Sequence, residues 1–299
     1  MSLFTSESSN ILKDPSWLQP LSDPPNGRPL CREADLKAMA NYLSELFRTG
    51  QARNLFIYGK PGTGKTICVK HLLSEVNRHA SETNSPVLTA YVNAGKTRTP
   101  YYTMAEILKQ LGVNVPSAGW QMFRLKQAFE HLLIEKSALI AVDEVDSIIF
   151  KEKEPLVYYL NRQPKTTLIL ISNKIEDATQ LPERALSTFQ PTLIYLEPYT
   201  PEETGRILKE RVEHAFKPGA ITDKLLNTIA QATSEAGDIR LGFCILLLAA
   251  ASADKARKRM IETEDVQVGI ENGTSLGKIK KLNQMKKQLL DLKKKYERK

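Results

Sequence analysis

The stretch Gly59-Lys60-Pro61-Gly62-Thr63-Gly64-Lys65-Thr66 constrains the fold of this chain more than any other part of the sequence. It matches the phosphate-binding pattern G-x-x-x-x-G-K-[ST] at every fixed position. Residues 54–58 before it are predicted to form a buried strand and residues 66–80 after it a helix, which is the context that the pattern requires. The alternative, a glycine-rich turn with an incidental lysine, does not account for this match in register.

Each residue type in this loop has a physical reason to bind phosphate. Gly59, Gly62 and Gly64 allow backbone angles that a Cβ would forbid, so backbone N–H groups can converge on phosphate oxygens at the N-terminus of a helix. We expect Lys65 to contact the β- and γ-phosphates of ATP, and the Thr66 hydroxyl to bind Mg²⁺. The loop therefore predicts a nucleotide-binding protein.

Composition excludes several other classes of protein. The chain has 299 residues and is 41% hydrophobic, which is enough for a real core and excludes global disorder. Cys31, Cys68 and Cys244 lie far apart, so they predict neither a zinc site nor a disulfide framework and suit a reducing compartment. No signal peptide is recognised, and the longest apolar run, residues 241–253, is too short to cross a bilayer. We expect a soluble protein of the cytoplasm, or of the nucleus in a eukaryote, with no membrane association.

Apolar strands alternate with helices up to Pro198. Such runs predict an α/β fold with a five-stranded parallel sheet covered on both faces. The strands are expected at residues 54–58, 86–94, 138–142, 167–171 and 193–196, and further helices at 32–48, 103–111 and 120–135. After Pro198 only helices are predicted, at 201–215, 222–234 and 238–256, with a polar link over 269–277. The predicted domains are an extended lead-in (1–30), a nucleotide-binding domain (31–197), a helical domain (198–272) and a basic amphipathic C-terminal helix (273–299).

Polar side chains follow two of the predicted strands at their carboxyl ends, where open α/β sheets bind ligands. Asp143 and Glu144 come directly after one strand, and Asn173 after the next. We expect Asp143 to hold Mg²⁺ and Glu144 to orient and deprotonate the attacking water, with Asn173 helping to hold that water.

These residues resemble the AAA+ ATPases, and over residues 28–270 the chain is most similar to their initiator clade, the origin-recognition subunits and related helicase loaders of archaea and eukaryotes. The resemblance rests on Gly59–Thr66, Asp143-Glu144-Val145-Asp146, Ile171-Ser172-Asn173, Glu183-Arg184-Ala185-Leu186-Ser187, Glu197-Pro198-Tyr199-Thr200 and Gly237-Asp238-Ile239-Arg240.

The resemblance implies roles for two arginines. It makes Arg184 the arginine finger that serves the ATP of a neighbouring subunit, and Arg240 the sensor 2 arginine that touches the γ-phosphate in its own subunit. Asp238 is a favourable N-cap, which places Arg240 in the first turn of its helix. A bland alternative for Arg184 is a surface residue of a loop, because the segment lacks the second arginine and the serine-rich run of many family members.

The resemblance also implies DNA as a partner, with one departure. About 27 residues follow the predicted helical domain, fewer than the roughly 80 that a winged-helix DNA-binding domain requires, so sequence-specific origin binding is not predicted. Family members carry a short helical element after the second strand that can touch DNA. Here the corresponding residues are 96–102, where Lys96 and Arg98 stand beside Tyr101 and Tyr102. These groups suit phosphate and sugar contacts, or the tyrosines pack the following helix.

Two functions are compatible with the sequence. The first is an ATP-switched DNA-replication initiator or helicase loader, which assembles with copies of itself or related AAA+ subunits on duplex DNA and acts on a replicative helicase. The second is a AAA+ regulator of a protein partner, such as a transposition regulator or a clamp-loader-like or remodelling subunit of a mobile element or virus. DNA binding that depends steeply on salt would distinguish them.

The C-terminal segment carries all of the excess charge. Residues 277–299 hold nine lysines and one arginine against two acidic residues, a net charge of +8 that equals that of the whole chain. A seam of apolar residues recurs there at spacings of three and four: Leu282, Met285, Leu289, Leu292 and Tyr296. One interpretation is a coiled-coil or domain-docking helix, and another is a cationic helix that binds DNA phosphates without sequence preference. An anionic membrane surface is a third.

Overall fold

The computed structural model describes residues 9–20, 22–116, 119–149, 156–179 and 188–273. The chain divides into two compact units, one of Gly27–Pro198 and one that joins Met1–Asn26 to Tyr199–Lys299. Arg184 and the basic segment 277–299 lie outside the described residues, so both remain sequence predictions.

The first unit is built on a five-stranded sheet in the order β2-β3-β4-β1-β5, and every pair of neighbours is parallel. Its strands are β1 (Leu55–Tyr58), β2 (Val87–Asn93), β3 (Ser137–Asp143), β4 (Thr166–Ser172) and β5 (Thr192–Tyr195). The predicted α/β fold with a five-stranded parallel sheet is confirmed.

Continuous apolar strands arise because both faces of this sheet are covered. On β3, Ala138, Ile140 and Val142 belong to the core on one face. Leu139 and Ala141, which alternate with them, belong to the core on the other face. Successive strand residues point to opposite faces, so every position of β3 is buried.

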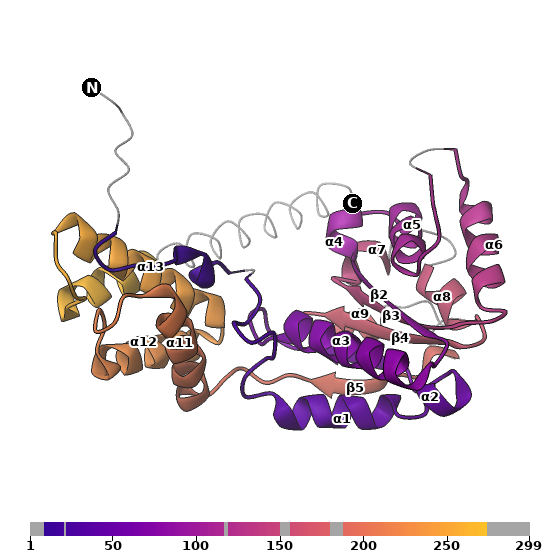
Figure 1. Ribbon diagram of the computed structural model, residues 1–299, viewed down its shortest axis with the longest axis horizontal. Coiled ribbons are helices and arrows are strands. Elements are labelled where there is room, and N and C mark those ends of the chain that lie inside the picture. The colour runs from indigo at the N-terminus through magenta and orange to yellow at the C-terminus, as the bar shows by residue number, and fades with distance from the viewer. Residues whose placement is uncertain (1–8, 21, 117–118, 150–155, 180–187, 274–299) are drawn as a thin grey trace, which may run out of the picture. The chain divides into compact units, whose positions relative to one another are not determined.

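Different helices cover the two faces (Figure 1). One face packs against helices that precede β2: α1 (Glu33–Leu43), α2 (Leu46–Thr49) and α3 (Lys65–Thr83). The other packs against helices that follow β2: α4 (Ala94–Thr97), α5 (Pro100–Gln110), α6 (Met122–Leu132), α7 (Asp146–Ile149), α8 (Leu156–Asn161) and α9 (Glu176–Thr179).

The helix predicted over 32–48 is interrupted. Ser44 ends α1, because its backbone N–H bonds to the Asn41 carbonyl 3.3 Å away and its hydroxyl donates to the same oxygen at 2.8 Å. A serine hydroxyl competes with the backbone in this way and disfavours continued helix. The chain resumes as α2, which ends at Gly50 in the left-handed conformation (φ 77°).

The second unit is helical, with capped helix starts. It contains α11 (Pro201–Ala215), α12 (Asp223–Ala236), α13 (Ile239–Lys255) and a further helical stretch over residues 263–273. Thr200 and Glu203 form a reciprocal capping box at the start of α11. The side chains of Thr222 and Asp238 cap α12 and α13.

The polar link predicted from residue 269 is wrong over 269–273, which are helical. A Cβ added at Gly269 would lie 2.8 Å from the Ile245 carbonyl oxygen, and one at Gly273 would lie 3.2 Å from the Leu241 side chain. These glycines therefore allow close packing against α13, a role that looks the same in sequence as a flexible connection.

The N-terminal lead-in is predicted to be extended and partly pinned by Trp17 and Leu18, and its described part folds into the second unit. Leu12 pairs with Phe216 in an antiparallel bridge, and a 3-10 helix, η1 (Pro15–Leu18), follows. Ile11 and Leu18 are fully buried in the core of the helical unit. Burial of these two apolar side chains outweighs the tendency of a Pro- and Ser-rich sequence to stay extended.

None of the helices in the described ranges is both long and apolar enough to cross a bilayer.

Candidate functional site

The phosphate loop, residues 59–66, runs from the carboxyl end of β1 to the first turn of α3. Gly59, Gly62 and Gly64 have φ values of 151°, 79° and 88°, a region that favours glycine. A Cβ added at Gly59 would lie 2.4 Å from the Leu196 carbonyl oxygen, so the strand end leaves no room for a side chain. The loop delivers the first turn of a 19-residue helix, whose leading N–H groups have no partners within the helix. This arrangement can bind an anion.

Lys65 connects the phosphate loop to the next strand end. Its ammonium group donates to the carbonyl oxygens of Gly59 at 2.7 Å and Lys60 at 2.9 Å, and to Asn173 Oδ1 at 3.0 Å. Only 8% of Lys65 is exposed. The side chain is therefore held inside the loop as a fixed positive charge, which suits the binding of phosphate oxygens.

Asp143 is the polar centre of the site. Its Oδ2 accepts hydrogen bonds from the Thr66 hydroxyl at 2.6 Å and the Tyr91 hydroxyl at 2.7 Å. Its Oδ1 accepts the backbone N–H of Glu144 at 2.8 Å. Strand pairing explains why Tyr91 of β2 lies close to Asp143 of β3. The two strands are in register at Asn93 and Asp143, and both end there.

The donor set fits Mg²⁺. Asp143 is 5% exposed, and all three of the groups that donate to it are neutral, so its buried negative charge would be balanced by a cation. Thr66 and Asp143 supply adjacent oxygen ligands, which are the kind that Mg²⁺ prefers. These two residues would hold the metal.

Glu144 follows Asp143 with a left-handed backbone (φ 51°), which is strained for a non-glycine residue and is often found at functional sites. Its exposed side chain reaches α4, where a Cβ added at Gly95 would lie 1.9 Å from Glu144 Oε2. Gly95 thus leaves the space that the carboxylate occupies. Asn93, whose side chain caps α4, lies on the same side of Gly95.

Besides Asn93 and Gly95, two further residues of this site were not predicted from the sequence. One is Tyr91, whose pKa is raised by burial and by the neighbouring Asp143 carboxylate. The other is Arg32, whose buried guanidinium donates to the Thr63 carbonyl of the phosphate loop at 2.9 Å and also to the Glu197 carbonyl. Asp35 pairs with the same guanidinium at 3.1 Å. Nothing in the spacing of either residue marks it in sequence, since both contacts depend on how strand ends and loop meet.

Arg240 lies in the helical unit, at the start of α13. Its guanidinium is bidentate on the Asp238 carboxylate, with Nε–Oδ1 and Nη2–Oδ2 distances of 2.8 and 2.6 Å. Hydrogen bonding to Asp238 raises the pKa of Arg240. The arginine implied to sense the γ-phosphate is thus paired with the residue that caps its own helix.

The two tyrosines of residues 96–102 lie in different environments. The Tyr101 hydroxyl donates to the Trp120 carbonyl at 2.7 Å, and its ring packs against the core, so Tyr101 has a structural role. Tyr102 is 60% exposed, edge-on to the Tyr101 ring. Arg98 has a left-handed backbone (φ 61°) between α4 and α5. Tyr102 is therefore the exposed tyrosine of this segment, and the side chains of Lys96 in α4 and Arg98 at its end are exposed as well.

The parallel sheet, the phosphate loop and the acidic strand end together define a P-loop nucleotide-binding protein of the AAA+ class. Residues 48–178 match the AAA domain family, and residues 205–271 match the Cdc6 AAA+ ATPase-type lid domain. The chain belongs to the AAA+ ATPases of the origin-recognition and helicase-loader clade.

Individual relatives agree with this placement. The ORC1-type DNA replication protein 1 of Archaeoglobus fulgidus is 29% identical over 248 residues, which cover 80% of this chain and 60% of the relative. The protein of the same name from Sulfurisphaera tokodaii is 32% identical over 242 residues, 77% of this chain and 60% of the relative. The structure of Aeropyrum pernix ORC1 in complex with DNA superposes with a TM-score of 0.77 at 26% identity, over 89% of this chain and 71% of the other. The chain therefore spans about 60% of the length of these curated relatives.

Proposed function

We propose that this protein binds and slowly hydrolyses ATP with Mg²⁺, and acts as an ATP-switched DNA-replication initiator or helicase loader. The observation that carries the proposal is the joining of three strand ends: the loop after β1 holds Lys65 and Thr66, β3 ends in Asp143, and Asn173 follows β4. These are the side chains that phosphoryl transfer needs at the end of a parallel sheet.

Each residue has a distinct task in this proposal. The N–H groups at the start of α3 and the Lys65 ammonium bind the phosphate oxygens. Glu144 accepts a proton from the attacking water, and Asn173 orients that water. Mg²⁺, when bound by Thr66 and Asp143, would neutralise the charge on the phosphates. Arg240 contacts the γ-phosphate of the ATP in its own subunit. Arg184 contacts the ATP of a neighbouring subunit.

Isothermal titration with ATP and a phosphate-release assay test the ATPase proposal. Lys65→Ala removes the charge held inside the loop and is expected to abolish tight binding. Glu144→Gln keeps the shape of the side chain and should bind ATP normally while losing hydrolysis. Hydrolysis by Glu144→Gln at the unmodified rate would exclude Glu144 as the base.

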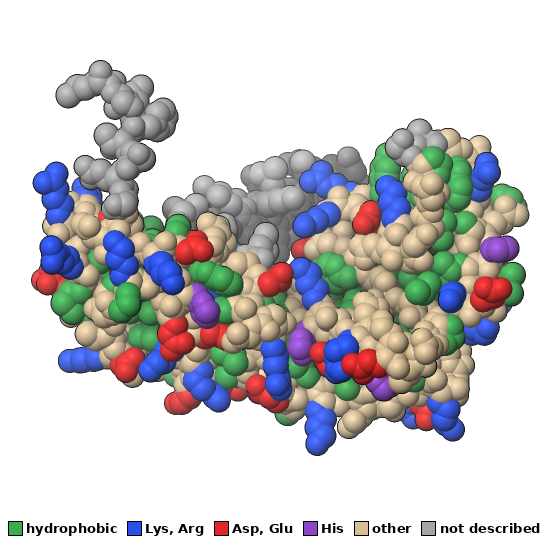
Figure 2. Space-filling model, viewed as in Figure 1, with side chains coloured by type: hydrophobic (Ala, Val, Ile, Leu, Met, Phe, Trp, Pro, Cys, Tyr) green, Lys and Arg blue, Asp and Glu red, His purple; other side chains and the backbone are tan. Residues whose placement is uncertain are grey.

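DNA as the partner rests on likeness and on charge. The Aeropyrum pernix ORC1 structure is of a complex with DNA. On the face of the helical unit in Figure 2, the described basic and acidic side chains are interspersed. The concentrated positive charge is in residues 277–299. We therefore assign non-specific phosphate binding to that segment, with Arg98 and Tyr102 as a second contact.

Fluorescence anisotropy with a labelled duplex, at a series of salt concentrations, tests this assignment. Deleting residues 277–299 is expected to weaken duplex binding and to flatten the slope of log affinity against log salt, by about 0.9 for each DNA phosphate that the segment neutralises. ATP binding should be unchanged. Equal slopes for the truncated and full-length proteins would show that the segment packs against protein instead.

Action of Arg184 in trans requires an oligomer, which light scattering with ATP and duplex DNA would detect. Arg184→Ala is expected to bind ATP but not to hydrolyse it alone. Mixing it with Glu144→Gln, which carries an intact finger, should restore activity. If both proteins assemble and activity stays absent, Arg184 does not act in trans. The same assembled state is the form in which binding of a replicative helicase should be measured.

A further inference from the structure

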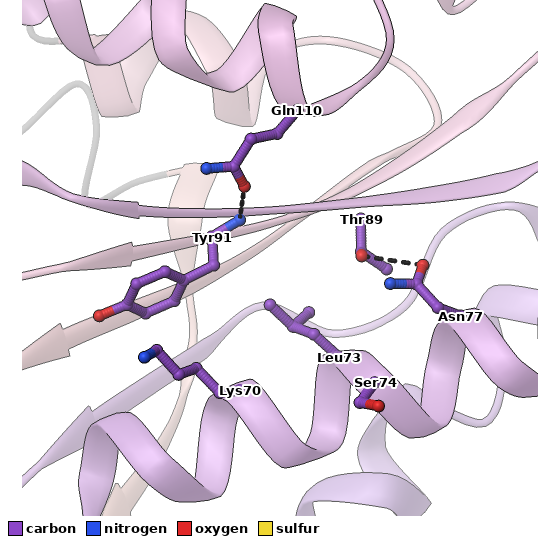
Figure 3. Close-up of a pocket in the computed structure, with 7 residues that line it drawn as sticks. All are labelled: Lys70, Leu73, Ser74, Asn77, Thr89, Tyr91 and Gln110. Atoms are coloured by element: carbon purple, nitrogen blue, oxygen red, sulfur yellow. Dashed lines mark hydrogen bonds between the residues drawn. The ribbon is translucent and has the colours of Figure 1, made fainter. Parts of the chain in front are cut away.

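Tyr91 lines a groove on the edge of the sheet (Figure 3), and its hydroxyl also bonds to Asp143 of the candidate metal site. It stands on β2, an edge strand of the sheet, and lines a groove between α3 and β2 that also includes Lys70 and Gln110. Its ring packs against the core on the α3 side of the sheet. Tyr91 is thus exposed to the groove at one side while its hydroxyl reaches the acidic end of β3.

The hydroxyl contact is short and is made to one particular oxygen. Tyr91 donates to Asp143 Oδ2 at 2.7 Å, the same oxygen that accepts the Thr66 hydroxyl at 2.6 Å. The other carboxylate oxygen is held by the Glu144 backbone N–H. When the Thr66 hydroxyl binds a metal ion, its hydrogen bond to Asp143 no longer fixes the orientation of that carboxylate. The Tyr91 hydroxyl is the side-chain donor that remains on Oδ2.

Neighbouring elements fix Tyr91 from two directions. Gln110 at the end of α5 accepts the Tyr91 backbone N–H at 2.8 Å, which anchors an edge strand position that lacks a strand partner on that side (Figure 3). Lys70 of α3 places its ammonium 5.5 Å from the ring centroid, and attraction of the cation to the ring face holds the ring. A tyrosine held in this way has few alternative positions for its hydroxyl.

We propose that Tyr91 is a positioning residue that orients the Asp143 carboxylate for Mg²⁺, through the hydrogen bond from its hydroxyl to Oδ2. This inference rests on the proposed function, because it assigns a role within the same nucleotide site. Residues that hydrogen-bond to metal ligands typically affect metal affinity by about 10-fold to 100-fold when removed. Tyr91 approaches the phosphate loop at Thr66, which is itself a candidate metal ligand. Its hydroxyl bond to Asp143 does not involve Lys65, so nucleotide binding without metal should depend little on it.

Tyr91→Phe tests the inference because it removes the hydroxyl and keeps the ring. The chain offers a matched control in Tyr159→Phe. The Tyr159 hydroxyl likewise lies 3.0 Å from a carboxylate, that of Glu130, and Lys126 lies 4.4 Å from its ring centroid. Tyr159 is on α8, in the core on the face of the sheet opposite to α3, so the same chemical change is made outside the site.

The measurement is the fluorescence of bound mant-ATP, with the full-length proteins, as a function of MgCl₂ concentration and separately in EDTA. For Tyr91→Phe we expect the MgCl₂ concentration at half-maximal signal to rise about 10-fold, with the mant-ATP affinity in EDTA unchanged. Tyr159→Phe should match the unmodified protein in both. Gln110→Ala, which loosens the Tyr91 backbone and keeps its hydroxyl, should raise the midpoint by less, and it preserves the test if Tyr91→Phe does not fold.

Two outcomes would overturn the inference in different ways. If Tyr91→Phe and Gln110→Ala keep the unmodified MgCl₂ midpoint, Tyr91 does not orient Asp143. If the affinity in EDTA falls as much as the affinity with MgCl₂, Tyr91 supports the fold of the site only. A failure of the proposed function looks different, because the unmodified protein itself would then show no effect of MgCl₂ on mant-ATP binding.

Discussion

Lys65 and Asn173 are 108 residues apart in the sequence, and the Lys65 ammonium donates to Asn173 Oδ1 across 3.0 Å. The bond joins the phosphate loop after β1 to the end of β4, its neighbour in the sheet. The amide therefore stands beside the charge that would face the γ-phosphate. An uncharged acceptor can share Lys65 with a phosphate, whereas a carboxylate would compete for it.

Substitutions at Asn173 should separate binding from hydrolysis. Asn173→Ala keeps the hydrogen bonds from Lys65 to the Gly59 and Lys60 carbonyls, so ATP affinity should change little. The hydrolysis rate should fall by about 100-fold, because Asn173 no longer orients the attacking water. Asn173→Asp should weaken ATP binding as well, by charge repulsion and by holding Lys65. Calorimetry and phosphate release measure the two effects. Equal ATP affinities for the Ala and Asp variants would contradict this account of the Lys65–Asn173 bond.

The space above Gly95 provides a way to displace Glu144 without changing it. Gly95→Ala would place a Cβ 1.9 Å from the present position of Glu144 Oε2, and the flexible carboxylate must move away. We expect ATP binding to persist and hydrolysis to fall about 10-fold or more, as for loss of a positioned base.

Gly205→Ala in α11 is the matched control. Its added Cβ would lie 3.8 Å from its nearest neighbour, the Ala230 side chain, which is an ordinary van der Waals distance. It should leave hydrolysis unchanged and stabilise its helix by up to about 1 kcal/mol. If Gly95→Ala hydrolyses ATP as fast as Gly205→Ala, the observed position of Glu144 is not the one that matters for the reaction.

How far the sequence predicts this molecule depends on whether a feature is local. The parallel sheet follows from apolar runs such as Ala138–Val142, which have to be buried on both faces. The phosphate loop follows from residue identity within eight positions. Helices α11 to α13 follow from the periodicity of their apolar residues and from the caps at Thr200, Thr222 and Asp238.

Features that depend on which segments meet in space were not predicted. Tyr91 reaches Asp143 because β2 pairs with β3 in one register, and neither residue's surroundings in sequence give that register. Arg32 reaches the Thr63 carbonyl across a gap of 31 residues. Gly95 and Gly269 look like turn or link residues until the groups that they make room for are known.

The pair formed by Arg240 and Asp238 gives a prediction about nucleotide discrimination. Asp238→Asn keeps a favourable N-cap for α13 but removes the charge that holds Arg240. Since the Arg240 side chain is 40% exposed, its ion pair with Asp238 contributes at most about 1 kcal/mol. Loss of the pair releases Arg240 to bind the γ-phosphate, which should raise the preference for ATP over ADP by up to about fivefold. Arg240→Ala should abolish that preference. Competition titrations with ATP and ADP measure the ratio, and an unchanged ratio in both variants would remove Arg240 from the γ-phosphate site.

The N-terminal segment gives the last prediction, because one buried arginine holds it. Arg211 of α11 is 3% exposed, and its guanidinium donates to four acceptors in residues 17–23: the carbonyls of Trp17, Ser22 and Asp23 and the Ser22 hydroxyl. Burial lowers the pKa of Arg211, although the group remains charged at any pH at which the protein folds. Arg211→Ala removes these four hydrogen bonds to the segment and should destabilise the helical unit by about 2–3 kcal/mol.

Trp17 allows this loss to be measured in the helical unit alone. The chain has two tryptophans, and Trp120→Phe leaves Trp17, whose ring lies 5.1 Å from that of His214, as the sole reporter. Urea unfolding followed by its emission should shift to lower urea for Arg211→Ala. Arg206→Ala, an exposed arginine on the same helix, should stay within about 0.5 kcal/mol of the parent. Equal midpoints for the two variants would mean that burial of Ile11 and Leu18, without Arg211, is sufficient to hold the segment in place.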